Sequence, residues 1–317
     1  MENKTVGKGR KIFAVIMCLA LMLAVLRLTH IILRVGGVYT TCFASEFPWR
    51  KWEPDDKNIS EIRYMKRAKE AVINGLDCQE LTNIDFLADF TTLERVYIFE
   101  SNETISIPSL KNSHDLKEMF TFQHTTDDLD FIADNPELEL ISVQVHERGL
   151  KDISGLRNKP ALSQIIIDTA CTDFSVLGDM PALERLAIEG SKKEECTGAD
   201  DDFIFPSLKS SVELNYVNIE NVEISNLDFI ADNKAIEKLT VHPEYTQITD
   251  ISGLKGKTKL KELELYNVSC TDFSVLRELT ALKKVTIAGS TIPEDIVKEL
   301  EKRYAVVKNP GLEEKSE

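Results

Sequence analysis

The chain has 317 residues, of which 43% are hydrophobic, and its 53 acidic and 38 basic side chains give a formal charge of −15. A composition this apolar supports a folded core, whereas a body this acidic repels the phosphates of a nucleic acid, so no nucleic-acid partner is expected. The six cysteines show neither a CxxC nor a paired Cys/His spacing. A zinc site is therefore not indicated, and no metal ion and no cofactor are expected.

The N-terminus carries a membrane-targeting signal. Four cations precede fifteen uninterrupted apolar residues, 12–26, and further apolar residues extend to Leu33. Fifteen helical residues span only about 22 Å of a hydrocarbon core of about 30 Å, so a spanning helix must continue to about Leu33. No small-residue cleavage site follows it. Residues 1–38 are therefore predicted to be an uncleaved signal-anchor, a single transmembrane helix.

The basic residues before this helix place the rest of the chain outside the cell, on the cell surface. A cleaved signal peptide, which yields a secreted protein, is the alternative. Residues 39–58 form a juxtamembrane linker rich in aromatic side chains, which suit the headgroup level of a membrane or pack on the next domain.

Residues 59–78 are predicted to be an N-terminal helical cap. The segment 60–75 starts with Ser60, has an apolar stripe at helical spacing and stops at Gly75. Cys42 and Cys78 flank this cap and are the most plausible disulfide in an oxidising exterior, although their spacing does not prove the pairing.

A block of the chain occurs twice, which indicates an internal duplication. Three segments recur at an offset of 98 or 99 residues: LDFIADN at 129–135 and 227–233, DISGL at 152–156 and 250–254, and CTDFSVL at 171–177 and 270–276.

A shorter unit, L-x-x-L-x-L, repeats inside each block at a period near 22 residues, with one longer interval at the charged insertion 191–200. Each unit alternates apolar and polar residues, as a strand does, and stacked units share one core. The nine units begin at Leu93, Leu116, Leu138, Leu162, Leu183, Leu214, Ile236, Leu260 and Leu282.

Period, strand pattern and an aspartate-led turn together resemble the leucine-rich repeat family, in the form of bacterial internalin-like surface proteins. The resemblance covers about residues 79–292, and the unit 260–287 is the most similar. It implies an α/β solenoid with parallel strands on its concave face. One departure is that no unit has asparagine at the position assigned just after the strand. A parallel β-helix has coils of similar length and is the competing fold.

Residues 293–317 are predicted to be a C-terminal cap and an acidic tail: Pro293 starts a helix, and AVVKN supplies a last short strand.

The repeated aspartates of the turns are interpreted as caps of backbone N–H groups and not as catalytic acids, because catalysis needs carboxylates that converge once. They are Asp85, Asp152, Asp173, Asp250 and Asp272. Cys171 and Cys270 occupy equivalent inward positions and are interpreted as core residues. The chain is therefore predicted not to be an enzyme, and its function is predicted to be the binding of a protein or glycan.

The residues around the two inward positions of each strand are predicted to face the concave side and to bind the partner. Aromatic side chains on the first two strands make an apolar patch of the kind that marks interaction sites. The candidate residues are Arg95, Tyr97, Phe99, Glu118, Phe120, Phe122, Tyr216, Glu264 and Tyr266.

Three alternatives to this interpretation are open. In the first, the N-terminal segment with Trp49 and Trp52 covers these rings. In the second, the protein is an envelope scaffold without a discrete ligand, and in the third it is a hydrolase built on a β-helix. The third requires a convergent pair of carboxylates, which the sequence does not display.

Overall fold

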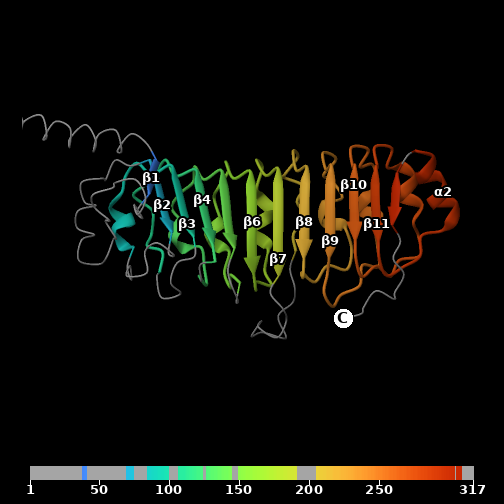
Figure 1. Ribbon diagram of the computed structural model, residues 1–317, viewed down its shortest axis with the longest axis horizontal. Helices are drawn as coiled ribbons and strands as arrows, with labels where there is room; N and C mark the ends of the chain where they lie inside the picture. The colour runs from blue at the N-terminus through green and yellow to red at the C-terminus, as the bar shows by residue number, and fades with distance from the viewer. Residues whose placement is uncertain are drawn as a thin grey trace, which may run out of the picture.

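The computed structural model describes residues 38–40, 69–74, 84–99, 106–123, 126–144, 149–190, 205–303 and 305–308. Its strands form one sheet in which every neighbouring pair is parallel and the order follows the chain (Figure 1). The strands are β1 (Val38–Thr40), β2 (Glu70–Asn74), β3 (Arg95–Phe99), β4 (Glu118–Phe122), β5 (Leu140–Gln144), β6 (Gln164–Thr169), β7 (Arg185–Gly190), β8 (Tyr216–Glu220), β9 (Lys238–His242), β10 (Glu262–Leu265), β11 (Lys284–Ile287) and β12 (Val306–Lys308).

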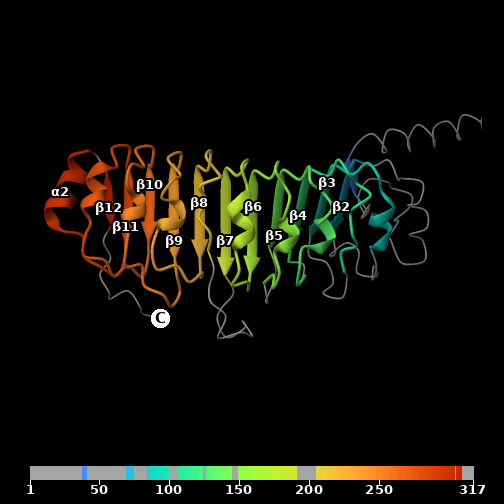
Figure 2. The ribbon, with the colours of Figure 1, turned by 180° about the vertical axis from the view of Figure 1, so that it is seen from behind.

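Short 3-10 helices follow most strands and stack along one side of the sheet, as the reverse view shows (Figure 2). They are η2 (Asp85–Asp89), η3 (Asp130–Ile132), η4 (Ser154–Leu156), η5 (Ser175–Asp179), η6 (Asp228–Ile230), η7 (Ser252–Leu254) and η8 (Ser274–Glu278). One strand and one turn per repeat therefore enclose a continuous core, and the array is the folding unit.

The nine predicted strands are β3 to β11, and the predicted C-terminal helix and strand are present as α2 (Glu294–Lys302) and β12. All described strands belong to one sheet, which agrees with a leucine-rich repeat solenoid and not with a β-helix. Burial alternates along the strands as the pattern requires. In β3, for example, Val96 and Ile98 are fully buried between half-exposed neighbours.

The helix predicted over 60–75 is wrong over its last part, because Glu70–Asn74 is strand β2. Ala71 and Ile73 are buried and pair in register with Val96 and Ile98 of β3. A strand here forms hydrogen bonds with the backbone N–H and C=O groups of β3, which a helix at this edge would leave unpaired. The free energy of this pairing outweighs the helix-forming tendency of the local sequence. Residues 60–68 lie outside the described residues.

Other predictions also lie outside the described residues: the membrane span of residues 12–33, most of the linker 39–58, the pairing of Cys42 with Cys78, and the insertion 191–200. Among the residues that are described, no helix has the length and apolar character needed to cross a bilayer.

The aspartate caps are confirmed at four positions. Each carboxylate accepts a hydrogen bond from the backbone N–H two residues later, at 2.7–2.8 Å, for Asp152, Asp173, Asp250 and Asp272. The prediction was wrong for Asp85. It is the first residue of η2 and therefore corresponds to Ser154 of η4, not to the capping Asp152. In the equivalent turns Asp128 and Asn226 provide the cap.

At the position assigned to the family's asparagine, the units of β8 and β10 have the buried residues Val222 and Val268. The residues just before them, Asn221 and Asn267, turn the chain after β8 and β10 with φ values of 56° and 53°. Asn267 Nδ2 donates a hydrogen bond to the Thr246 carbonyl at 3.0 Å. Asparagine tolerates this left-handed conformation, which valine does not.

A second set of polar residues, the turn ladder, stabilises the helical side of the solenoid. Each member precedes the first apolar residue of a unit by three residues and donates a side-chain hydrogen bond to a carbonyl of the previous turn. Because these side chains are almost completely buried, they satisfy carbonyls that water cannot reach. The members are Ser113, Asn135, Lys159, Ser211, Asn233 and Lys257.

Cys270 is buried in the core, and Cys171 is partly buried and packs against the core, as predicted. Burial raises the pKa of both thiols to about 11, so neither is a reactive thiolate at neutral pH.

Candidate binding surface

The candidate residues lie on the outer face, defined here as the side of the sheet opposite the 3-10 helices. Neighbouring strands are in register, so outward side chains form rows across the sheet. Arg95 pairs with Glu118, Tyr97 with Phe120 and Phe99 with Phe122. The six candidate residues of β3 and β4 therefore lie together, as predicted from the alternation.

Tyr97, Phe99 and Phe120 form an aromatic cluster. The ring centroids of Phe99 and Phe120 are 5.5 Å apart, those of Tyr97 and Phe120 6.3 Å, and those of Tyr97 and Phe99 6.5 Å with parallel planes. These separations are typical of favourable aromatic pairs. All three side chains are only half-buried, and the neighbouring Phe122 is 37% exposed, so the cluster presents apolar surface to the outside.

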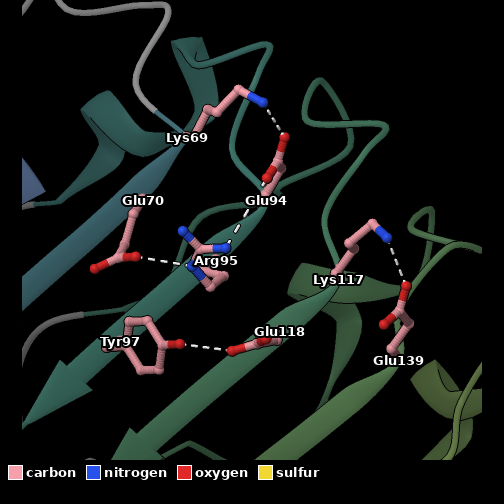
Figure 3. A network of polar contacts seen from close by, with 8 residues as sticks. All are labelled: Lys69, Glu70, Glu94, Arg95, Tyr97, Lys117, Glu118 and Glu139. Carbon is pink, nitrogen blue, oxygen red and sulfur yellow. Dashed lines mark hydrogen bonds and ion pairs between the residues drawn. The ribbon is translucent and has the colours of Figure 1, made fainter. Parts of the chain in front are cut away.

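A polar network fixes the base of the cluster (Figure 3). Tyr97 donates its hydroxyl hydrogen to Glu118 Oε2 at 2.6 Å, and Arg95 Nε donates to Glu70 Oε2 at 2.8 Å. Partial burial together with the hydrogen bond to the Glu118 carboxylate raises the pKa of Tyr97 to about 12. Tyr97 is therefore neutral at physiological pH and presents its ring to the outside, while its hydroxyl group is engaged.

Ion pairs extend along the edge where the strands begin, and Glu94 joins one of them to the network through Arg95, at 4.0 Å. Lys69 pairs with Glu94 and Lys117 with Glu139, at 2.5 and 2.7 Å, as Figure 3 shows. Each pair joins two neighbouring strands, but both are solvent-exposed and contribute little to stability.

The other three candidates are not part of this cluster, because they lie on later strands. The Arg185 guanidinium lies 4.3 Å from the centre of the Tyr216 ring, a cation–π contact. Glu264 forms an ion pair with Lys284, and the Tyr266 ring lies 4.7 Å from the His242 ring. The outer face thus has an aromatic half, on β3 and β4, and a separate charged half, on β8 to β11. Tyr216, Glu264 and Tyr266 belong to the charged half.

The duplicated blocks show that the two halves have diverged. Strands β4 to β7 of the first block correspond to β8 to β11 of the second. Each strand has one outward position just before its first inward residue and one between its two inward residues. At none of these eight positions is the residue identical in the two blocks. Phe120 corresponds to Asn218 and Ile166 to Glu264. By contrast, the turn ladder has Ser, Asn and Lys in the same order in both blocks.

Two features of this face were missed from the sequence. Outward Ile166 and Ala187 continue the row of Tyr97 and Phe120 across β6 and β7. Asp168, Glu189 and Glu220 form a second row at the ends of β6, β7 and β8. Aligning the outward positions of successive units would have shown both rows, whereas the search for aromatic side chains did not.

The described residues contain no group of three or more His, Cys, Asp or Glu side chains arranged to hold a metal ion. Several of their carboxylates are instead engaged in turn caps or in ion pairs between neighbouring strands.

No protein-family model matches the sequence, and a search of curated proteins finds no match either. Similarity is found among solved structures. An internalin of Listeria monocytogenes is similar with a TM-score of 0.57 at 17% identity, over 89% of this chain and 84% of that chain. A leucine-rich repeat protein of Leptospira interrogans is similar with a TM-score of 0.52 at 14% identity, over 81% of this chain and 70% of that chain.

The parallel sheet, the stacked turns and these similarities define a leucine-rich repeat solenoid. Among such proteins the fold is internalin-like, as the resemblance of the repeats implied.

Proposed function

We propose that the protein is a membrane-tethered binding protein of the cell surface, without catalytic activity, and that its outer face binds a protein or glycan through the aromatic half. Residues 1–38 anchor it as an uncleaved signal-anchor, and the solenoid lies outside the cell. Release by signal cleavage is the alternative localisation.

The divergence of the outer face is the observation that carries this proposal. The two blocks arose from one sequence and kept their ladder, their turn motifs and an apolar core. The architecture therefore does not require particular residues at the outward positions, and yet β3 and the adjoining strand β4, the first of the duplicated block, bring three half-buried aromatic rings together there. Rings held rigidly on adjacent strands provide large contact area at low entropic cost, which is typical of binding hot spots.

A scaffold without a ligand is less consistent with this face, because a scaffold favours polar outward residues throughout, such as Asn218 and Thr240 of the second block. The fold itself does not decide the matter, since folds do not dictate function. Covering of the rings by the N-terminal segment is the other alternative, and the binding experiment separates it.

The test compares two double variants of the full-length protein. Tyr97→Ala with Phe120→Ala removes two rings of the aromatic cluster, and Tyr216→Ala with Tyr266→Ala removes two rings of the charged half. The first pair is expected to weaken capture of the partner by about 2 kcal/mol or more, roughly thirtyfold, and the second pair to leave it nearly unchanged. Unchanged capture by the first pair together with a lowered melting temperature favours self-covering, and moves the search to Tyr216, Glu264 and Tyr266.

The topology has its own test. Protease added to intact cells should remove the solenoid while the segment before residue 38 stays in the membrane. A mature protein that begins beyond residue 33 contradicts the anchor and supports secretion.

A further inference from the structure

The aromatic cluster and the neighbouring Phe122 form an apolar patch that is small for a binding surface. Phe122 is 37% exposed and the three rings of the cluster are less exposed. Because a whole aromatic side chain has about 200 Å² of surface, the patch presents on the order of 300 Å². Stable interfaces bury about 800 Å² on each partner. Binding through this patch therefore needs a partner that is already concentrated beside it.

The charged side chains of the network beside the patch are paired with one another (Figure 3). The ion pairs are Lys69 with Glu94, Arg95 with Glu70, and Lys117 with Glu139. The fourth carboxylate, that of Glu118, accepts the hydroxyl hydrogen of Tyr97. This network is therefore close to neutral, although the chain as a whole carries a formal charge of −15. Such a surface can meet an equally acidic molecule without strong repulsion.

The patch lies at the end of the solenoid that adjoins the proposed membrane anchor. Only residues 34–37 separate Leu33, where the spanning segment is predicted to end, from β1. Five Cα steps reach at most about 18 Å, and two to three inter-strand steps from β1 to β3 and β4 add about 10 to 14 Å. Strand β12, eleven steps from β1, can lie about 53 Å away. All copies in one membrane therefore hold their patches at a similar height, within about 32 Å of the end of the anchor.

We propose that the protein bound by the aromatic half is a second copy of this chain, anchored in the same membrane. A two-fold axis normal to the membrane relates the two copies, so the same patch serves both, and the rings of one copy pack on those of the other. The anchors restrict both copies to one plane, which raises their effective concentration and offsets the small contact area. This inference rests on the proposed function, on its anchor as well as on its aromatic half, and names the partner.

The test measures covalent cross-linking between copies of the full-length protein in liposomes of zwitterionic lipid. Phe122 is replaced by the photoreactive residue p-benzoylphenylalanine, which lies at the exposed rim of the patch. The same replacement of Tyr266, on the charged half, is the control. On irradiation the probe at Phe122 should give a covalent dimer, and the probe at Tyr266 about fivefold less or lower still.

Two changes of condition test the physical basis of this contact. In a large excess of detergent micelles, which separates the copies, the dimer from the Phe122 probe should fall about tenfold or more, because the patch alone is too small. Raising the salt from 50 to 500 mM in the liposomes should leave the dimer nearly unchanged, because the contact is apolar.

Variants with the probe at Phe122 show whether the rings make the contact. Tyr97→Ala with Phe120→Ala should lower the dimer about fivefold or more. Phe120→Asn should lower it as well, and this variant keeps the fold because the second block has asparagine at the same strand position. The matched control, Tyr216→Ala with Tyr266→Ala, should leave the dimer unchanged.

Three results overturn the inference: no dimer from the Phe122 probe, cross-links confined to one chain, or equal dimer yields in all variants. The second result shows that the chain covers its own patch, and the third that the copies associate through another surface. If capture of a different protein still depends on Tyr97 and Phe120, the proposed binding function stands and only the second copy is the wrong partner. Failure of the anchor is detected separately, by the topology test above.

Discussion

Lys159 and Lys257 lie 98 residues apart in the chain and bury their ammonium groups against equivalent backbone turns. Each Nζ donates hydrogen bonds to three carbonyls that end a 3-10 turn: those of Ile132, Ala133 and Asn135 at 2.8–3.3 Å for Lys159, and those of Ile230, Ala231 and Asn233 at 2.7–3.5 Å for Lys257. Both blocks thus have a buried lysine at this position of the turn ladder, whereas the other turns have a neutral serine or asparagine there.

The first prediction concerns the pH dependence of stability. Burial lowers the pKa of both lysines from 10.5 to about 8 in the folded protein. Above pH 8 the unfolded state binds more protons than the folded state, so the free energy of unfolding should rise, by about 1 kcal/mol per lysine between pH 7 and 9. Urea unfolding at both pH values measures this rise.

The matched control for this experiment is Lys159→Met with Lys257→Met, in which the rise should be absent. The window stops at pH 9 because Cys171 and Cys270, whose pKa values are raised to about 11, act in the opposite direction above the ordinary thiol value of 9. A wild-type stability that stays flat or falls from pH 7 to 9 contradicts the prediction.

The second prediction tests the aspartate caps. Asp173 accepts a hydrogen bond from the Ser175 N–H at 2.8 Å, and Asn226 accepts the same bond in η6. Asp173→Ala should therefore cost about 1 kcal/mol of stability, whereas Asp173→Asn should cost much less. Thermal unfolding at pH 7 compares the two, and equal losses would show that charge, not capping, is the role of this residue.

The same bond predicts an acid dependence. The hydrogen bonds from Ser175 lower the pKa of Asp173 below its ordinary value of 3.8. The ionised form therefore contributes stability above pH 3.8, and this contribution is lost as the pH falls through the lower folded value. The difference between wild type and Asp173→Asn should shrink over that range.

The third prediction concerns the close stacking of turns. A Cβ at Gly155 would lie 2.2 Å from the Leu129 carbonyl oxygen, whereas a Cβ at Gly178 would approach Pro206 no closer than 3.3 Å. Gly155→Ala should cost about 3 kcal/mol, because backbone atoms of the previous turn must move, and Gly178→Ala should cost far less. Denaturant unfolding of both variants measures the two costs, and similar values would contradict this account.

The fourth prediction concerns the aromatic cluster. The absorbance change of Tyr97 on ionisation, obtained as the difference between wild type and Tyr97→Phe, should have a midpoint near pH 12. In Glu118→Gln the midpoint should move toward 10, since a carboxylate no longer opposes the phenolate, while partial burial still keeps it above that value. An unchanged midpoint in Glu118→Gln would contradict the hydrogen bond between these side chains.

Predictions from the sequence succeeded where a residue's role repeats. The inward positions of β3 to β11 follow a strict period, because every strand must bury the same side against the same core. The helix predicted over 60–75 is wrong at Glu70–Asn74 because the pairing of β2 with the edge of β3 depends on residues about 25 positions away in the chain. A pattern of neighbouring residues does not include the energy of this strand pairing.

By itself, the sequence determined the repeat, the parallel order of the strands, the turn caps and the aromatic residues of β3 and β4, since these depend on periods and on residue types. The tertiary structure alone decided which outward residues meet. Register places Asp168, Glu189 and Glu220 in one row, and stacking places the Lys159 ammonium on three carbonyls of the previous turn. Such contacts join residues about 20 to 30 positions apart, and their energies depend on burial and distance, which exist only once the repeats have stacked.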